Sequence, residues 1–393
     1  MIGAGVFASI GPAARAAGNG LLLGLGIAAA LAYCNATSSA QLAALYPESG
    51  GTYVYGRKRL GHFSGFLAGW GFVIGKLASC AAMAITFASY AAPAFARPLA
   101  VTAVLALTAL NLVGVQKTAL VTRIIVVLVL TSLAVVVSAV LFGGSTDAAR
   151  LWPLVGVSPY GVLQAAGFFF FAFAGYARLA TLGEEVIDPA KTIPRAIPIA
   201  LVITFAIYTT VAVSALLAVE PAALAESHAP LAVAVEAGRW AVAAPVVRFG
   251  ASVASLGVLL SLIVGVSRTV FAMASNSDLP RTFAAVHPLT RVPHRAEVAV
   301  GVVVAIAAAL ADLRSAIGFS AFAVLVYYAV ANAAAFSLRV DERRWPRWMS
   351  VAGFVGCVVV ATSLPLASVI GGVVLFAVGG AYYVVALRSA PHA

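Results

Sequence analysis

Long apolar stretches separated by short polar segments dominate this chain. Counting a shorter apolar segment at the start, they lie at about residues 1–17, 21–45, 65–91, 99–115, 120–142, 160–182, 197–219, 245–273, 297–313, 315–338, 349–366 and 368–387. Roughly 18–20 apolar residues are enough for a helix to cross a bilayer. The stretches lack the alternating apolar and polar residues of a β-barrel strand. The pattern therefore predicts an all-α integral membrane protein with twelve transmembrane helices.

The first apolar segment is too short to cross a membrane by itself. From Val6 to Ala17 a helix rises about 18 Å, which is roughly half of the hydrocarbon core. We expect the first helix to be truncated here, and the reading frame to continue upstream of Met1 for about 10–15 mostly apolar residues.

Composition excludes a soluble protein, because 63% of the residues are hydrophobic and only 9% are charged. Soluble domains carry about 25% charged residues. No soluble domain of useful size fits between the stretches, so residues 1–393 are expected to form a single transmembrane domain. Its expected partner is the lipid bilayer, and its expected location is the inner (cytoplasmic) membrane of a cell.

The net charge of +11 reflects basic residues that lie mainly between the apolar stretches. They do not cluster with aromatic residues, as a nucleic-acid interface would require. With twelve spans, the Arg57–Arg59 segment and twelve further basic residues lie on one side of the membrane. Six basic residues lie on the opposite side. By the positive-inside rule, both termini are expected to be cytoplasmic.

Metal, disulfide and catalytic chemistry find no support in the sequence. Cys34, Cys80 and Cys357 lie within apolar stretches and are odd in number, which fits small packing residues. The histidines lie in polar segments without metal-ligand spacing, and the spans lack a catalytic arrangement of residues. We therefore expect that the protein binds no cofactor and is not an enzyme.

The sixth stretch contains an interruption. It begins with the bulky run Phe168–Phe171, loosens at Ala174-Gly175, carries a charge at Arg178 and ends at Glu184-Glu185. A broken helix in lipid leaves backbone groups without partners at a cost of several kcal/mol each, so such breaks persist where they line a cavity. The break is a candidate binding site, and the alternative is a glycine that only packs against a neighbouring helix.

A second glycine cluster, Gly3-Ala4-Gly5, lies in the first stretch, five spans before Gly175. Interrupted helices five spans apart are typical of an inverted five-plus-five repeat. The repeats would cover about residues 1–142 and 159–338, and two additional helices would cover about 349–387.

Four motifs then resemble one family over essentially the whole chain. Ile2-Gly3-Ala4-Gly5-Val6-Phe7 with Gly11-Pro12 resembles the first-helix motif of the amino acid–polyamine–organocation transporters. Further similarity to these transporters lies in Tyr46–Tyr53, in Phe171–Tyr176 with Ile193-Pro194-Arg195, and in Ser267-Arg268 with His287-Pro288. The resemblance implies a LeuT-like fold with discontinuous helices 1 and 6.

By this resemblance, the protein is a secondary transporter for amino acids or related amines that works by alternating access. Free amides at the start of a half-helix suit a substrate carboxylate, and free carbonyls at the end of another suit its ammonium group. The resemblance implies a substrate site at Ile2, Gly3, Ala4, Gly5, Val6, Phe171, Ala172, Phe173, Ala174, Gly175 and Tyr176.

Two aromatic residues of this set have open alternatives. Phe171 occupies a position where the family often has an aromatic gate, but its neighbours in the phenylalanine run make lipid-facing packing a rival interpretation. Tyr176 either contacts the substrate or hydrogen-bonds a neighbouring helix.

The sequence departs from the family at positions that bear on energy coupling. Val129 stands where some relatives have a fifth-helix lysine, and Gly75 stands where many have a third-helix glutamate. Lys76 lies within a span, where it either replaces a coupling cation or reaches an interface with its ammonium group. Arg178 also lies within a span, where a clamp to Glu184 or Glu185 and a substrate contact are the two interpretations.

The sequence therefore predicts an amino-acid permease that is independent of sodium and is driven by protons or by exchange. A substrate-sensing or degenerate transporter without net transport is the alternative function, and a polyamine or other organic amine is the alternative substrate. The sequence does not indicate the oligomeric state.

Overall fold

The computed structural model describes residues 2–48, 50–114, 119–152, 156–176 and 188–387. Throughout these ranges the secondary structure is helical, without a β-strand. The helices that coincide with the expected apolar stretches are α1 (Gly5–Ala17), α2 (Leu21–Leu45), α4 (His62–Ala91), α5 (Ala96–Leu112), α6 (Ala119–Phe142), α7 (Pro159–Phe173), α9 (Pro189–Ala218), α12 (Ala244–Ser275), α13 (His294–Leu310), α14 (Leu313–Phe336), α15 (Arg347–Ser363) and α16 (Leu366–Tyr382).

The prediction of an all-helical membrane protein is confirmed. Eight segments of the described chain are long and apolar enough to cross a membrane, and the first of them, Gly5–Leu45, contains both α1 and α2. Pro159–Phe173 and Arg347–Ser363 are shorter apolar helices. Each of the twelve expected stretches contains a helix, and the largest difference is α7, which ends at Phe173 although its stretch was expected to reach residue 182.

In the described ranges, three short α-helices lie between the long ones, where the sequence indicated only polar connections. They are α3 (Thr52–Leu60), α10 (Pro221–Glu226) and α11 (Pro230–Glu236). Prolines at the first turns of α10 and α11 favour helix starts there, because their missing amide hydrogens need no partner at that position. His62 and His294, which were expected in connecting segments, are the first residues of α4 and α13.

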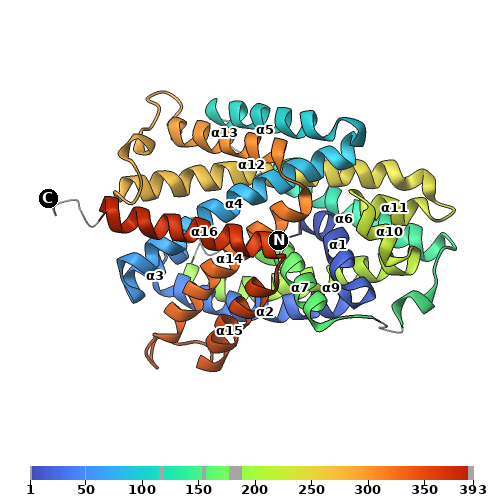
Figure 1. The fold of residues 1–393 in the computed structure, drawn as a ribbon, viewed down its shortest axis with the longest axis horizontal. Helices are drawn as coiled ribbons and strands as arrows, with labels where there is room; N and C mark the ends of the chain where they lie inside the picture. Colours follow the sequence, from blue (N-terminus) through green and yellow to red (C-terminus); the bar gives the residue numbers. More distant parts are fainter. Residues whose placement is uncertain (1, 49, 115–118, 153–155, 177–187, 388–393) are drawn as a thin grey trace.

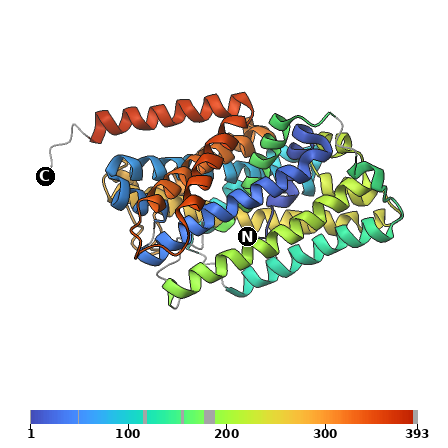
Figure 2. The same ribbon diagram turned by 90° about the horizontal axis from the view of Figure 1, so that it is seen from below.

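The helices form a bundle whose long axis is horizontal in Figure 1. At its centre α4 packs against α12 and α14, while α7 packs against α1 and α2. The helices α5, α12 and α13 lie side by side along one edge of the bundle (Figure 1). Both views place the start of α1 near the middle of the long axis, deep inside the bundle (Figures 1 and 2).

Small residues let the central helices approach closely. A Cβ at Gly24 of α2 would lie 2.7 Å from the Ala165 Cβ of α7. A Cβ at Gly75 of α4 would lie 2.9 Å from the Ala323 Cβ of α14. Helices in membranes commonly associate through such small-residue contacts. In contrast, α16 lies along the outside of the bundle and exposes Ile370, Val373 and Val374, as expected for a lipid-facing helix (Figure 2).

Candidate functional site

The first part of the candidate site is the start of α1. The helix begins at Gly5, and its first intrahelical bond runs from the Ala8 amide to the Ala4 carbonyl, with an N···O distance of 3.2 Å. The amides before Ala8 therefore have no carbonyl partner within α1. Ala4 and Val6 are fully buried, whereas Ile2, Gly3 and Gly5 are partly exposed. The start of this helix thus presents free backbone donors inside the protein.

The second part is the end of α7. The α-helix stops at Phe173, and a 3₁₀ turn follows over Ala174–Tyr176. The last turn of an α-helix leaves carbonyl groups without helical partners, so the end of α7 presents acceptors. Gly175 lies in the 3₁₀ turn and is exposed, while Ala172 and Phe173 are buried. The α-helical geometry ends just before the Ala174-Gly175 pair, as the sequence predicted.

The structure brings these two helix ends into direct contact. A Cβ at Gly5 would lie 2.7 Å from the Ala172 Cα and 2.9 Å from the Ala172 Cβ. Only a glycine allows two backbones to come this close. The predicted residues around Gly5 and around Ala172 therefore form one place in the protein, although more than 160 residues separate them in the sequence.

Tyr208 of α9 joins both parts, and the sequence interpretation did not single it out. Its hydroxyl donates a hydrogen bond to the Ala172 carbonyl with an O···O distance of 3.4 Å. The backbone of Gly3 contacts the same hydroxyl. Tyr208 is the only tyrosine in α9, and the side chain is fully buried. A lone tyrosine in an apolar span would have been a signal, because a buried phenol needs a hydrogen-bond partner.

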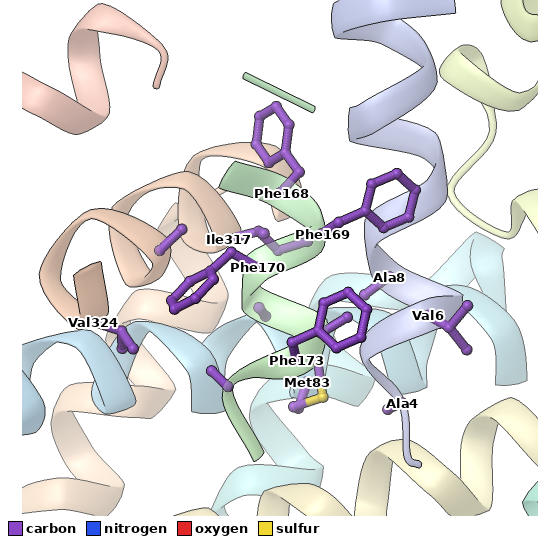
Figure 3. Packing of buried hydrophobic residues seen from close by; sticks show 14 of the residues in the cluster. Ala4, Val6, Ala8, Met83, Phe168, Phe169, Phe170, Phe173, Ile317 and Val324 are labelled. Atoms are coloured by element: carbon purple, nitrogen blue, oxygen red, sulfur yellow. The ribbon is translucent and has the colours of Figure 1, made fainter. Parts of the chain in front are cut away.

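The phenylalanine run surrounds α7 instead of facing one side. Figure 3 shows Phe169 and Phe173 directed toward α1, and Phe170 directed toward α14. Phe170 makes an edge-to-face contact with Tyr328, with ring centroids 5.7 Å apart, and Phe173 packs on Tyr208 at 5.3 Å. Phe171 is the only partly exposed member of the run and packs against the core. Its role as a gate stays a prediction.

Lys76 lies inside the protein, with 8% of its surface exposed. Its Nζ lies 5.9 Å from the centroid of the Phe72 ring, one helical turn away on α4. In the described part of the chain its ammonium group has no ion pair or hydrogen bond. Met83, which lies near α1 and α7 in Figure 3, is about 10 Å further along α4. Lys76 is therefore about two helical turns from the meeting point of the helix ends.

The two positions at which the chain departs from the family are packed apolar positions. At Gly75 there is no space for a glutamate without moving α14, because even a Cβ would meet Ala323 at 2.9 Å. Val129 of α6 is fully buried. The packing of α4 against α14 at Gly75 therefore requires a very small residue there.

Three predicted charged residues, Arg178, Glu184 and Glu185, lie outside the described residues, as does the side chain of Tyr176. The predicted clamp between Arg178 and a glutamate therefore stays a prediction. Among the residues that are described, no group of three or more His, Cys, Asp or Glu side chains is placed to hold a metal ion.

A polar cluster connects α3 with the segment after α12. Asp278 is 1% exposed and accepts hydrogen bonds from the Tyr53 hydroxyl (2.5 Å) and the Arg57 guanidinium (2.9 Å). His62 Nε2 lies 3.1 Å from the other carboxylate oxygen of Asp278. Burial and the neighbouring Asp278 raise the pKa of the Tyr53 hydroxyl, which keeps it protonated, as a donor, well above neutral pH. The cluster fixes α3, with its basic residues, against the end of α12.

These features define a class: a multi-pass helical membrane protein in which the start of α1 meets the end of α7 at its centre. The comparisons with known proteins agree with this class. The family model described as "Amino acid permease" matches residues 1–391, and the chain therefore belongs to the amino acid permease family within the amino acid–polyamine–organocation superfamily. It is a membrane transporter, not an enzyme.

The chain is similar to several individual proteins. The uncharacterized transporter Rv1999c of Mycobacterium tuberculosis is 59% identical over 385 residues, which cover 98% of this chain and 87% of the relative. The branched-chain amino acid permease BcaP of Bacillus subtilis is 25% identical, with 90% of this chain and 81% of the relative covered. The chloroplastic cationic amino acid transporter 7 of Arabidopsis thaliana is 29% identical, with 88% and 65% covered.

Proposed function

We propose that this protein is a secondary active permease that moves amino acids across the cytoplasmic membrane by alternating access. The observation that carries the proposal is the contact between Gly5 and Ala172, where a Cβ would approach the opposing Cα to 2.7 Å. It sets amides without helical partners at the start of α1 beside carbonyls without helical partners at the end of α7. A zwitterionic substrate needs both kinds of group when it leaves water.

The substrate is held, in this proposal, mainly by backbone. Amides around Ala4–Val6 bind the carboxylate, and carbonyls around Phe171–Ala174 bind the ammonium group. Tyr208 keeps the two segments in register because its hydroxyl reaches both Gly3 and Ala172. Backbone recognition of the groups shared by all amino acids leaves side-chain selectivity to other residues. The relatives named for branched-chain and for cationic amino acids are compatible with such a division.

The proposal includes two repeats of inverted topology, at about residues 1–142 and 159–338, followed by α15 and α16. In this arrangement α1 and α7 would occupy corresponding positions, and the helix start at Gly5 and the helix end at Phe173 support it. Both chain ends are placed on the cytoplasmic side, as the distribution of basic residues supports. Transport is proposed to be independent of sodium and to be driven by protons or by exchange.

Uptake by purified protein in proteoliposomes tests this proposal. Radiolabelled leucine and arginine would be offered first, followed by a polyamine, with and without sodium and with and without a pH gradient. We expect saturable uptake of at least one amino acid in sodium-free buffer. If amino acids raise the melting temperature without any uptake, the sensing alternative replaces transport. Uptake of the polyamine alone would change the substrate class, and the absence of both binding and uptake would refute the proposal.

Replacing Tyr208 with phenylalanine tests the proposed site. The change removes one hydroxyl and keeps the ring that packs on Phe173. Loss of a hydrogen bond to a backbone group costs about 0.5–1.5 kcal/mol, which corresponds to roughly 2- to 12-fold weaker binding. Tyr160→Phe is the control, since Tyr160 is 54% exposed and lies at the far end of α7. Equal affinity in both variants would contradict the role of Tyr208.

A further inference from the structure

A second buried polar site lies between α5, α12 and α13, away from the meeting point of α1 and α7. Its central residue is Glu297, in the first turn of α13, whose exposed fraction is 2%. The Ser267 hydroxyl of α12 and the Asn111 amide of α5 lie against its carboxyl group. Figure 1 shows the three helices side by side along one edge of the bundle. A buried carboxyl in an apolar protein is costly unless it is neutralised or fully hydrogen-bonded.

The polar atoms of this site are only partly satisfied. Within the described residues, Oε1 of Glu297 and both amide atoms of Asn111 are buried without a partner in hydrogen-bond geometry. Asn111 is 4% exposed. Ser267 donates its hydroxyl hydrogen to the Ile263 carbonyl at 2.7 Å, so its oxygen faces the carboxyl as an acceptor. Buried polar groups without partners are uncommon in proteins, so their gathering around one carboxyl calls for a physical explanation.

Tight packing one turn away restricts what can bind. A Cβ at Gly301 of α13 would lie 2.5 Å from Thr108 Cγ2 of α5, so these helices are in contact immediately beside the site. Thr108 and Asn111, and likewise Glu297 and Gly301, are about one helical turn apart. The close contact at Gly301 therefore holds the Asn111 amide against the carboxyl, without an obvious space for a large ligand.

The chemistry of the site favours a proton over a metal cation. The site offers oxygen atoms from Glu297, Asn111 and Ser267, fewer than the six or more ligands that hard cations such as Ca²⁺ or Mg²⁺ take. The Arg268 guanidinium of α12 is in electrostatic range of Glu297 and favours the ionised carboxylate. The Cys80 thiol of α4 is a further titratable neighbour, and His294 and Arg295 share the first turn of α13 with Glu297. A proton needs no additional volume.

The Asn111 amide can hydrogen-bond the Glu297 carboxyl in both its ionised and its protonated state. When the carboxyl is ionised, the amide NH₂ can donate to Oε1. When it is protonated, its O–H can donate to the amide oxygen after the amide turns over, because an amide carries donors and an acceptor on one planar group. The first-turn position in α13 favours the ionised form, since a helix N-terminus attracts negative charge. Both states are therefore accessible within one backbone arrangement.

We propose that Glu297, together with Asn111 and Ser267, is a proton-binding site whose occupancy sets the pH dependence of transport or of substrate binding. The inference rests on the proposed permease function and names the group that couples it to protons. The link to the substrate site is α12, whose Val258 lies 3.1 Å from where a Cβ of Gly3 would be. Val258 and Ser267 are about 13 Å apart along this helix. Protonation of Glu297 changes how α12 is held by α5 and α13.

The test replaces Glu297 with glutamine, which mimics the protonated group. Uptake and ligand-induced stabilisation would be measured between pH 5 and 8 in sodium-free proteoliposomes and in detergent. We expect the wild-type pH profile of uptake or affinity to follow a single titrating group, so that its steep part changes by up to about tenfold per pH unit. In the variant, the same quantity should change by less than about twofold over the whole range. The matched control is Glu236→Gln, an exposed carboxylate that pairs with Arg248 on the protein surface.

Asn111→Leu provides an independent measurement if the glutamine variant does not fold. It removes the donor to the ionised carboxyl, so the midpoint of the pH profile should move to higher pH while its shape remains. A flat wild-type profile, a wild-type profile in Glu297→Gln, or an unmoved midpoint in Asn111→Leu would overturn the inference. In a parallel measurement with sodium added, a sodium effect that is present in the wild type and lost in Glu297→Gln would also overturn it, in favour of a metal cation. Because binding is measured as well as uptake, a protein that binds without transporting still decides the result.

Discussion

Replacing Gly5 with alanine is the most direct test of the meeting point between α1 and α7. The new Cβ would lie 2.7 Å from the Ala172 Cα, 2.9 Å from its Cβ and 3.4 Å from its carbonyl oxygen. Carbon atoms pack best at about 3.5–4.0 Å, so the two helix ends must separate by roughly 1 Å. The obstacle is mainly backbone and a methyl group, so no flexible side chain can move aside.

The expected energies separate function from stability. Overpacking typically costs about 1–3 kcal/mol, and alanine regains up to about 1 kcal/mol of helix propensity, so the protein should still fold. If the separation weakens substrate binding by about 1.4–3 kcal/mol, affinity falls by roughly 10- to 150-fold. Gly26→Ala in α2 is the matched control, because among the described residues no atom of another helix lies within 4 Å of its new Cβ.

Substrate affinity and uptake in proteoliposomes, together with the melting temperature, measure the outcome. We expect Gly26→Ala to match the wild type and Gly5→Ala to lose affinity with only a small loss of melting temperature. A folded Gly5→Ala protein whose affinity is within twofold of the wild type would show that these helix ends do not form the substrate site.

Three further changes test other parts of the structure. Gly175→Val should abolish uptake while the protein still inserts, because a β-branched residue disfavours the loosened backbone, and normal uptake by a well-expressed variant would contradict this. Lys76→Met keeps the aliphatic stem and removes the charge. If Lys76 couples transport to protons, the variant loses pH-driven accumulation. Intact accumulation would leave Glu297 as the candidate coupling group. Asp278→Asn should weaken the attachment of α3 by about 1.5–3 kcal/mol and speed tryptic cleavage near Arg57, whereas Glu48→Gln, at an exposed pair with Lys58, should not.

The sequence alone determined the class of protein and most helix positions. Apolar stretches such as 21–45 and 315–338 correspond closely to α2 and α14, because a helix is the arrangement that satisfies the backbone within one segment in lipid. The end of regular α-helix before Ala174-Gly175 was also predictable, since glycine weakens a helix locally. The four motifs, which are local runs of residues, were sufficient to indicate the family.

Other features depended on which helix faces meet. Nothing local to Tyr208 indicates that its hydroxyl reaches Gly3 and Ala172, and nothing local to Asp278 indicates Tyr53 and Arg57 as its partners. Glu297 counts in the sequence as a charge near the start of a span, yet the structure places it against Asn111 and Ser267. Hydrophobicity sets where a helix lies along the chain, but its rotation and neighbours follow from packing between distant segments. Contacts between polar side chains inside the bundle were therefore decided by the tertiary structure.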